Sequence, residues 1–182
     1  DLPAGVTAPP LQVAESSAAS ALPGEVALDE RDGTYLMRAI AWSRTGRERG
    51  NRPFGAVVVS DDGEVLAEAW CNGTETGDCT GHAEMMALRQ VSPQVDRETL
   101  ARATIYSSAE PCVMCAGAIF WSNIRRVVYG IDAVRLRVFR GERPEQRDAE
   151  LSCRDVFAAS PHLIECVGPA LIEAASAPHI GV

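Results

Sequence analysis

The chain has 182 residues, of which 46% are hydrophobic and 23% are charged, and its formal net charge at pH 7 is −8. A chain of this length buries enough apolar surface to fold as one domain without disulfides. The acidic balance argues against a protein that grips nucleic acid by its phosphates, and no apolar run is long enough to span a bilayer.

The N-terminal segment has a different composition from the rest of the chain. Residues 1–24 are rich in Ala, Pro, Ser and Gly, and they hold too few large apolar groups to offset the entropy of ordering. We therefore predict a flexible arm over residues 1–30 and a single domain over residues 31–182. No signal peptide is visible, and the six cysteines are expected to be reduced, which together favour a cytoplasmic location.

The first elements after the arm are a helix and a hairpin. Apolar residues at helical spacing predict a helix over 32–46. The β-branched run 54–59 and the run 64–70 flank the turn "DDG" at 61–63, which predicts two paired strands. The Gly- and Thr-rich stretch 72–81 is expected to be a loop.

The central part of the chain alternates helices and strands. Asp78 or Thr80 is expected to cap a helix over 82–91. A short strand over 103–108 then leads through "AEPC" into a helix over 112–121.

The C-terminal part gives weaker signals. A strand over 125–130 is followed by a polar, Arg-rich loop, a helix near 152–159, a strand over 162–168 and a last helix from Pro169. Strands that alternate with helices after an initial hairpin indicate an α/β fold, a three-layer α/β/α sandwich around a mixed five-stranded sheet.

One histidine and two cysteines stand at the starts of two of the predicted helices. Cys112 and Cys115 are three residues apart on one helical face, and His82 begins the other helix. A CxxC pair alone is also typical of core residues or of a redox motif. Three His/Cys ligands suit Zn²⁺ and leave the fourth tetrahedral position open, as in catalytic zinc sites.

Glu84 follows His82 by two residues, and neither a core nor a redox role for the cysteines explains it. Beside an open zinc position, a carboxylate can take a proton from water and return it to a leaving group. The order and spacing therefore indicate metal-assisted hydrolysis with Glu84 as the catalytic acid and base.

The signature H-x-E…P-C-x-x-C resembles that of the zinc nucleobase deaminases. Through "PFGAVVV", "GHAEMMALR" and "AEPCVMCAGAIFWSNIRRVVYG", the chain is similar to the cytidine deaminase-like superfamily, and above all to the purine branch of guanine deaminase and tRNA adenosine deaminase. The resemblance covers residues 32–131. It implies a zinc-dependent aminohydrolase with the same three-layer fold, and it implies a homodimer.

The resemblance also implies where the base is held. Phe54 and Trp121 look like the guanine-type aromatic residues, and Asn72 and Ala83 complete the expected base-binding positions. Both aromatic residues are equally compatible with a place in the core. A small purine base or nucleoside is favoured, and a tRNA substrate or a catalytically silent zinc-folded partner subunit are the alternatives.

Two features depart from the family pattern. Counting back from His82, Cys71 stands where relatives carry the asparagine that hydrogen-bonds the base, so either a one-residue loop shift lets Asn72 restore the contact or the base is held differently. The C-terminal segment is also unusual. It offers acidic residues that could close the site, and a histidine that either meets substrate or is solvated: Glu142, Glu145, Glu173 and His179.

Overall fold

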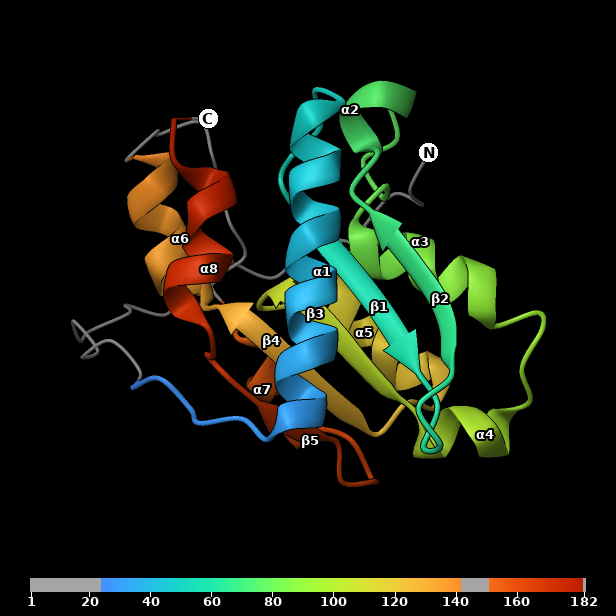
Figure 1. Cartoon of the computed structure of the whole chain (residues 1–182). Helices are drawn as coiled ribbons and strands as arrows, with labels where there is room; N and C mark the ends of the chain where they lie inside the picture. Colours follow the sequence, from blue (N-terminus) through green and yellow to red (C-terminus); the bar gives the residue numbers. More distant parts are fainter. Residues whose placement is uncertain (1–23, 142–150, 182) are drawn as a thin grey trace, which may run out of the picture.

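The computed structural model of the chain describes residues 24–141 and 151–181. These residues form a five-stranded sheet with the order β2-β1-β3-β4-β5 (Figure 1). The strands are β1 (Gly55–Val59), β2 (Val65–Trp70), β3 (Thr104–Ala109), β4 (Arg126–Ile131) and β5 (Glu165–Val167).

The sheet is mixed, as the sequence predicts. β1 is antiparallel to both of its neighbours, with Val57 opposite Glu68 on β2 and opposite Tyr106 on β3. β3, β4 and β5 run parallel. The carboxyl ends of β3 and β4 therefore lie at one edge of the sheet, and the chain leaves β3 there toward Cys112.

Helices cover both faces of the sheet. In Figure 1, α1 crosses in front of the strands while α3 and α5 lie behind them. The helices are α1 (Glu30–Glu48), α2 (Gly73–Thr76), α3 (Ala83–Val91), α4 (Arg97–Arg102), α5 (Val113–Ser122), α6 (Ala133–Arg140), α7 (Cys153–Ala158), α8 (Ile172–Ser176) and the 3₁₀ turn η1 (Ala177–His179). No helix of the described residues is long and apolar enough to cross a membrane.

The sheet separates two hydrophobic cores, and β1 contributes to both. Val57 and Val59 face α1, whereas Ala56 and Val58 face α3. All five residues of β1 are buried, because side chains of successive residues point to opposite faces and both faces are covered. This packing explains the continuous apolar run in the sequence and confirms the three-layer sandwich.

Three stretches that the sequence does not predict to be helical are helical: α2 within the expected loop 72–81, α4 and α6. Asp96 accepts hydrogen bonds from the backbone of Glu98 and Thr99 and so caps α4. Asp132 accepts from the backbone of Arg135 and caps α6. The Arg-rich run therefore contains a helix. Arginine and apolar residues alternate along it, so its apolar face is narrow.

The predicted caps of α3 are wrong. The N-cap is His82, which has extended backbone angles and no side-chain cap hydrogen bond. The carboxylate of Asp78 instead accepts from the backbone and the hydroxyl of Thr80, and so closes a turn within the preceding loop.

The N- and C-terminal parts of the described chain contact each other. Val26 donates its backbone N–H to the Pro169 carbonyl at 2.7 Å, and the backbone N–H of Ile172 donates to Glu25 at 2.8 Å. Residues 24–29, which the sequence analysis placed in the arm, thus lie against the C-terminal segment. The rest of the predicted arm, residues 1–23, lies outside the described residues.

A partly buried ion pair joins α1 to the sheet. Arg126 on β4 donates two hydrogen bonds to the Asp32 carboxylate, at 2.8 and 2.7 Å, and the Tyr106 hydroxyl donates a third at 2.8 Å. Arg126 and Tyr106 lower the pKa of Asp32 below its usual 3.8 although burial opposes them. The carboxylate is therefore ionised and held between the helix and two strands.

Candidate active site

The site forms where α3 and α5 begin. The two helices pack against each other behind the sheet, and their N-caps are His82 and Cys112. Both residues have extended backbone angles, and neither side chain makes a capping hydrogen bond. The imidazole and the thiol are therefore available to bind something other than their own helix.

His82, Cys112 and Cys115 come together as the sequence predicts. Their ligand atoms all lie within 4.8 Å of one another. The Nδ1 atom of His82 is 3.5 Å from the sulfur of Cys112 and 3.6 Å from that of Cys115. Zn–S bonds of about 2.3 Å and Zn–N bonds of about 2.0 Å at tetrahedral angles place nitrogen and sulfur about 3.5 Å apart. The three side chains thus fit a tetrahedral zinc ion.

The three groups share their protons unequally. Hydrogen bonds from the Cys115 thiol and from His82 lower the pKa of Cys112 to about 4. The hydrogen bond to Cys112, and then burial, raise the pKa of Cys115. A hydrogen bond to Cys112 also raises the pKa of His82. Cys112 is consequently a thiolate at neutral pH, and a bound dication would replace the remaining protons.

Glu84 lies in the first turn of α3, beside the metal ligands. Its side chain is buried, and the Ser107 hydroxyl donates to its Oε1 atom at 2.8 Å. Its Oε2 atom is 3.4 Å from the sulfur of Cys115. Burial first, and then the negative charge of Cys112, raise the pKa of Glu84. A carboxyl group with a raised pKa beside a metal site is suited to accept and release a proton.

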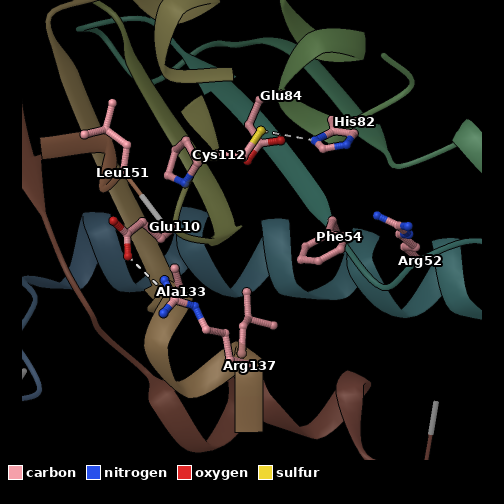
Figure 2. Close-up of a pocket in the computed structure, with 11 residues that line it drawn as sticks. Arg52, Phe54, His82, Glu84, Glu110, Cys112, Ala133, Arg137 and Leu151 are labelled. Carbon is pink, nitrogen blue, oxygen red and sulfur yellow. Dashed lines mark hydrogen bonds between the residues drawn. The ribbon is translucent and has the colours of Figure 1, made fainter. Parts of the chain in front are cut away.

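A pocket opens beside these residues. Figure 2 shows Phe54 and Arg52 on one side of it and Glu110 and Leu151 on the other. The metal-ligand end is formed by His82, Glu84 and Cys112, and α6 adds the remaining wall through Ala133, Leu136 and Arg137. The pocket is therefore built partly by α6, which lies where the sequence predicts an Arg-rich loop.

Glu110 joins the pocket to the C-terminal elements, and the sequence analysis did not identify it. Its Oε2 atom accepts the backbone N–H of Ala133 at the start of α6. Its Oε1 atom accepts the Ser152 hydroxyl at 2.6 Å and the backbone N–H of Cys153 at 3.3 Å, at the start of α7. One carboxylate thus holds two helix starts, and only its place directly before "PCVMC" could have drawn attention to it.

Of the residues predicted to hold the base, Phe54 lines the pocket. Its ring lies 5.2 Å from the ring of His179, which is buried and thus not solvated. Ala83 is fully buried in the first turn of α3, within the core. Glu173 is exposed and is not among the lining residues, while Glu142 and Glu145 lie outside the described residues.

Cys71 and Asn72 do not line the pocket. Cys71 is 2% exposed and donates its backbone N–H to the Phe54 carbonyl at 2.9 Å. Asn72 donates its backbone N–H to Gly81, and its buried Oδ1 atom has no hydrogen-bond partner among the described residues. Asn72 is therefore not part of the pocket wall, and its contact with the base stays a prediction.

Trp121 lies outside the pocket. Its side chain is 75% exposed and contacts Phe120 edge-on. Because six residues advance an α-helix by about 1.7 turns, Trp121 points to a different side of α5 from Cys115. The spacing that looked like part of the site therefore carries the ring to the surface of this chain.

Comparisons with known proteins agree with this geometry. The profile of the family described as "Cytidine and deoxycytidylate deaminase zinc-binding region" matches residues 29–131. A probable cytosine deaminase of Schizosaccharomyces pombe is 38% identical over 85% of this chain and 93% of its own length, and the guanine deaminase of Bacillus subtilis is 39% identical over 54% and 64%. A solved structure from a study of A-to-I editing by tRNA:A34 deaminases is 31% identical, with a TM-score of 0.57 over 74% of this chain and 96% of that one.

Proposed function

The chain belongs to the cytidine and deoxycytidylate deaminase zinc-binding family, and on this basis we propose that it hydrolytically deaminates a small purine base or nucleoside, guanine-type ahead of adenine-type, with release of ammonia. Zinc-dependent deamination is the activity of the family; the choice of ring is our proposal. The observation that carries the proposed deamination is the buried Glu84 carboxylate beside three side chains spaced for tetrahedral zinc, at one side of a pocket that Phe54 lines.

In the proposed mechanism, His82, Cys112 and Cys115 hold the zinc ion, which when bound lowers the pKa of water toward neutrality. Glu84 accepts a proton from the attacking water and delivers it to the departing amino group. The Ser107 hydroxyl, which donates to Oε1, orients the carboxylate so that its other oxygen faces the metal ligands. Burial raises the pKa of Glu84 and so supports both halves of this proton transfer.

The flat face of Phe54 supports an aromatic ring as substrate, because aromatic side chains stack on planar bases. Cytosine is the second candidate, because the Schizosaccharomyces pombe relative matches nearly its whole length. A tRNA substrate is the third. The net charge of −8 disfavours it, since such proteins usually present a basic face to the phosphates.

The test is an ammonia-release assay on zinc-loaded protein with guanine, guanosine, adenine, adenosine, cytosine and a tRNA transcript. We expect turnover with guanine or guanosine first. Turnover confined to cytosine would replace the purine proposal, and inosine formed only in tRNA would replace both.

The matched variant for this assay is Glu84→Gln, which keeps the size of the side chain. We expect it to retain about one zinc per chain while kcat falls by at least about a hundredfold, since general acid–base groups contribute 10²- to 10⁴-fold. Unchanged turnover would exclude the mechanism. The absence of turnover by either protein on every substrate would favour a catalytically silent zinc-folded subunit.

We also propose that the chain forms a homodimer through α5 and acts in the cytoplasm. Val113, Gly117 and Trp121 follow one another at four-residue spacing and share a face of α5 on the side away from Cys115. Val113 and Trp121 are 38% and 75% exposed, and no atom would contact a Cβ added at Gly117. Such a face suits close approach of a second copy.

The thiol ligands of the metal favour a reducing compartment, which supports the proposed cytoplasmic location.

A further inference from the structure

A second pair of cysteines lies away from the metal ligands. Cys153 is the first residue of α7 and is fully buried, and Cys166 is the middle residue of β5 and is partly exposed. Their sulfur atoms are 3.6 Å apart. Both residues lie beyond the 29–131 segment that matches the family profile, so neither belongs to the shared metal chemistry.

We propose that Cys153 and Cys166 form a redox modification site, in which a hydroperoxide converts the two thiols to a reversible disulfide, with Cys166 as the attacking and Cys153 as the resolving residue. The site is independent of the proposed substrate. It requires only that the two sulfurs approach by about 1.5 Å, since a disulfide bond is about 2.05 Å long.

Arg154 assigns the attacking role to Cys166. Its guanidinium group donates to the carbonyl of Cys166 and to the carbonyl of Gly168, both at 2.8 Å, and it lies against the ring of Tyr129. It is therefore fixed beside β5, where its positive charge favours a thiolate. The hydrogen bond from Cys153, and then the charge of Arg154, lower the pKa of Cys166 although burial opposes them. The same hydrogen bond and burial raise the pKa of Cys153. The Glu110 carboxylate opposes ionisation of both thiols.

Solvent exposure also favours Cys166 over Cys153 as the attacking residue. Cys166 lines a surface pocket between α7 and β5 together with Arg154, Phe157 and His162. Cys153 has no exposed surface. A small peroxide can thus reach Cys166 from solvent, while Cys153 meets only a sulfur that is already oxidised.

The chemistry balances with the peroxide as the two-electron oxidant. The Cys166 thiolate attacks one peroxide oxygen, the O–O bond breaks, and Cys166 becomes a sulfenic acid while the other oxygen leaves as hydroxide or alkoxide. The sulfur of Cys153 then attacks the sulfenic sulfur, the S–O bond breaks as the S–S bond forms, and the proton of the Cys153 thiol passes to the departing hydroxide, which leaves as water. An added dithiol reverses the modification by exchange.

The test uses zinc-loaded full-length protein treated with hydrogen peroxide below one equivalent, blocked with an alkylating reagent and mapped by peptide mass spectrometry. We expect a Cys153–Cys166 linked peptide that dithiothreitol removes. Cys166 should be lost at least about tenfold faster than the exposed Cys79. Faster oxidation of Cys79 than of Cys166 in the folded protein would overturn the proposal.

Two variants distinguish the roles, with far-UV circular dichroism and zinc content as checks of folding. Cys153→Ser should leave Cys166 as a sulfenic acid that dimedone traps, and Cys166→Ser should leave Cys153 free to be alkylated after unfolding. Cys79→Ser is the control and should form the disulfide at the wild-type rate. If dimedone labels Cys153 in Cys166→Ser as fast as it labels Cys166 in Cys153→Ser, the assignment of Cys166 as the attacking residue is overturned. The wild-type map decides the proposal even where a variant fails to fold.

Discussion

The segment from α1 to β4 and the segment from α6 to η1 build different parts of one pocket. The first segment supplies His82, Cys112 and Glu84, which are rigidly placed at helix starts behind a buried sheet. The second supplies Leu136 and Arg137 as a wall, together with the buried His179 against Phe54. Reaction chemistry is thus concentrated in the first segment, and the shape that selects a substrate is divided between the two.

The difference predicts that the substrate can vary among proteins that share the metal chemistry, and the relatives of this chain are named for different bases. The family profile ends at residue 131, where the second segment begins. The two segments meet through Glu110, the β4–β5 pairing and the packing of α7 against α5. A change in α6, which lines the pocket and holds no metal ligand, should therefore alter the pocket wall more than the ligand positions. Substitutions on either side of this boundary should therefore have different consequences.

Cys115→Ser should have the largest effect, because it removes a buried ligand of the first segment. Since groups that only support metal ligands already contribute about 10- to 100-fold, we expect zinc content well below one per chain and activity lowered by more than about a hundredfold. Metal analysis and ammonia release measure both quantities. Cys79→Ser, at an exposed position, is the control; equal zinc content in the two variants would contradict the assigned ligand set.

The same boundary separates what the sequence predicts from what it does not. The metal ligands and the acid–base residue are predictable because His82, Glu84, Cys112 and Cys115 stand in a fixed order at two helix starts, and β1 is predictable because it is continuously apolar. α6 was missed because Leu136 alone among its large apolar residues is well buried, while Val138 is 76% exposed. The outward direction of Trp121 follows from its six-residue spacing to Cys115 on α5, whereas the position of Asn72 is set by a loop turn that the sequence does not predict.

Arg126→Ala should mainly lower stability. It leaves the Asp32 carboxylate buried with only the Tyr106 hydroxyl as a side-chain donor among the described residues. Because Arg126 itself is 30% exposed, we expect a loss of about 2–3 kcal/mol, below the cost of breaking a fully buried pair. Denaturant unfolding measures the loss, and kcat should stay near that of the wild type. Arg102→Ala is the control, because its partners Asp61 and Glu98 are exposed and the expected loss is below about 1 kcal/mol.

The pH dependence of unfolding tests the same ion pair. Because Arg126 lowers the pKa of Asp32 in the folded state, the pair contributes stability above the usual value of 3.8 and loses it as pH falls through the folded pKa. Arg126→Ala should flatten this acid limb. An unchanged acid limb, or a loss of stability no larger than that of Arg102→Ala, would show that the pair does not hold α1 to the sheet.

Glu110→Gln should disturb the junction between the segments while the metal ligands stay in place. The amide offers one acceptor oxygen instead of two, so either the α6 start or the α7 start loses its partner, at about 1–3 kcal/mol. We expect KM to rise about tenfold with kcat nearly unchanged, since the wall moves and the chemistry does not. Glu98→Gln, at a side chain that is 87% exposed, is the control. A fall in kcat at unchanged KM would instead assign Glu110 to the reaction.

Trp121→Ala should have the smallest effect on the chain itself and a specific effect on its assembly. Trp121 and Val138 are matched in exposure, at 75% and 76%, but lie in different segments. Each alanine variant should unfold within about 0.5 kcal/mol of the wild type. Since a tryptophan at the centre of an interface contributes about 2 kcal/mol or more, Trp121→Ala should weaken self-association in analytical ultracentrifugation at least about tenfold, and Val138→Ala should not. If Val138→Ala dissociates the protein and Trp121→Ala does not, the second segment carries the interface, and α5 contributes only chemistry.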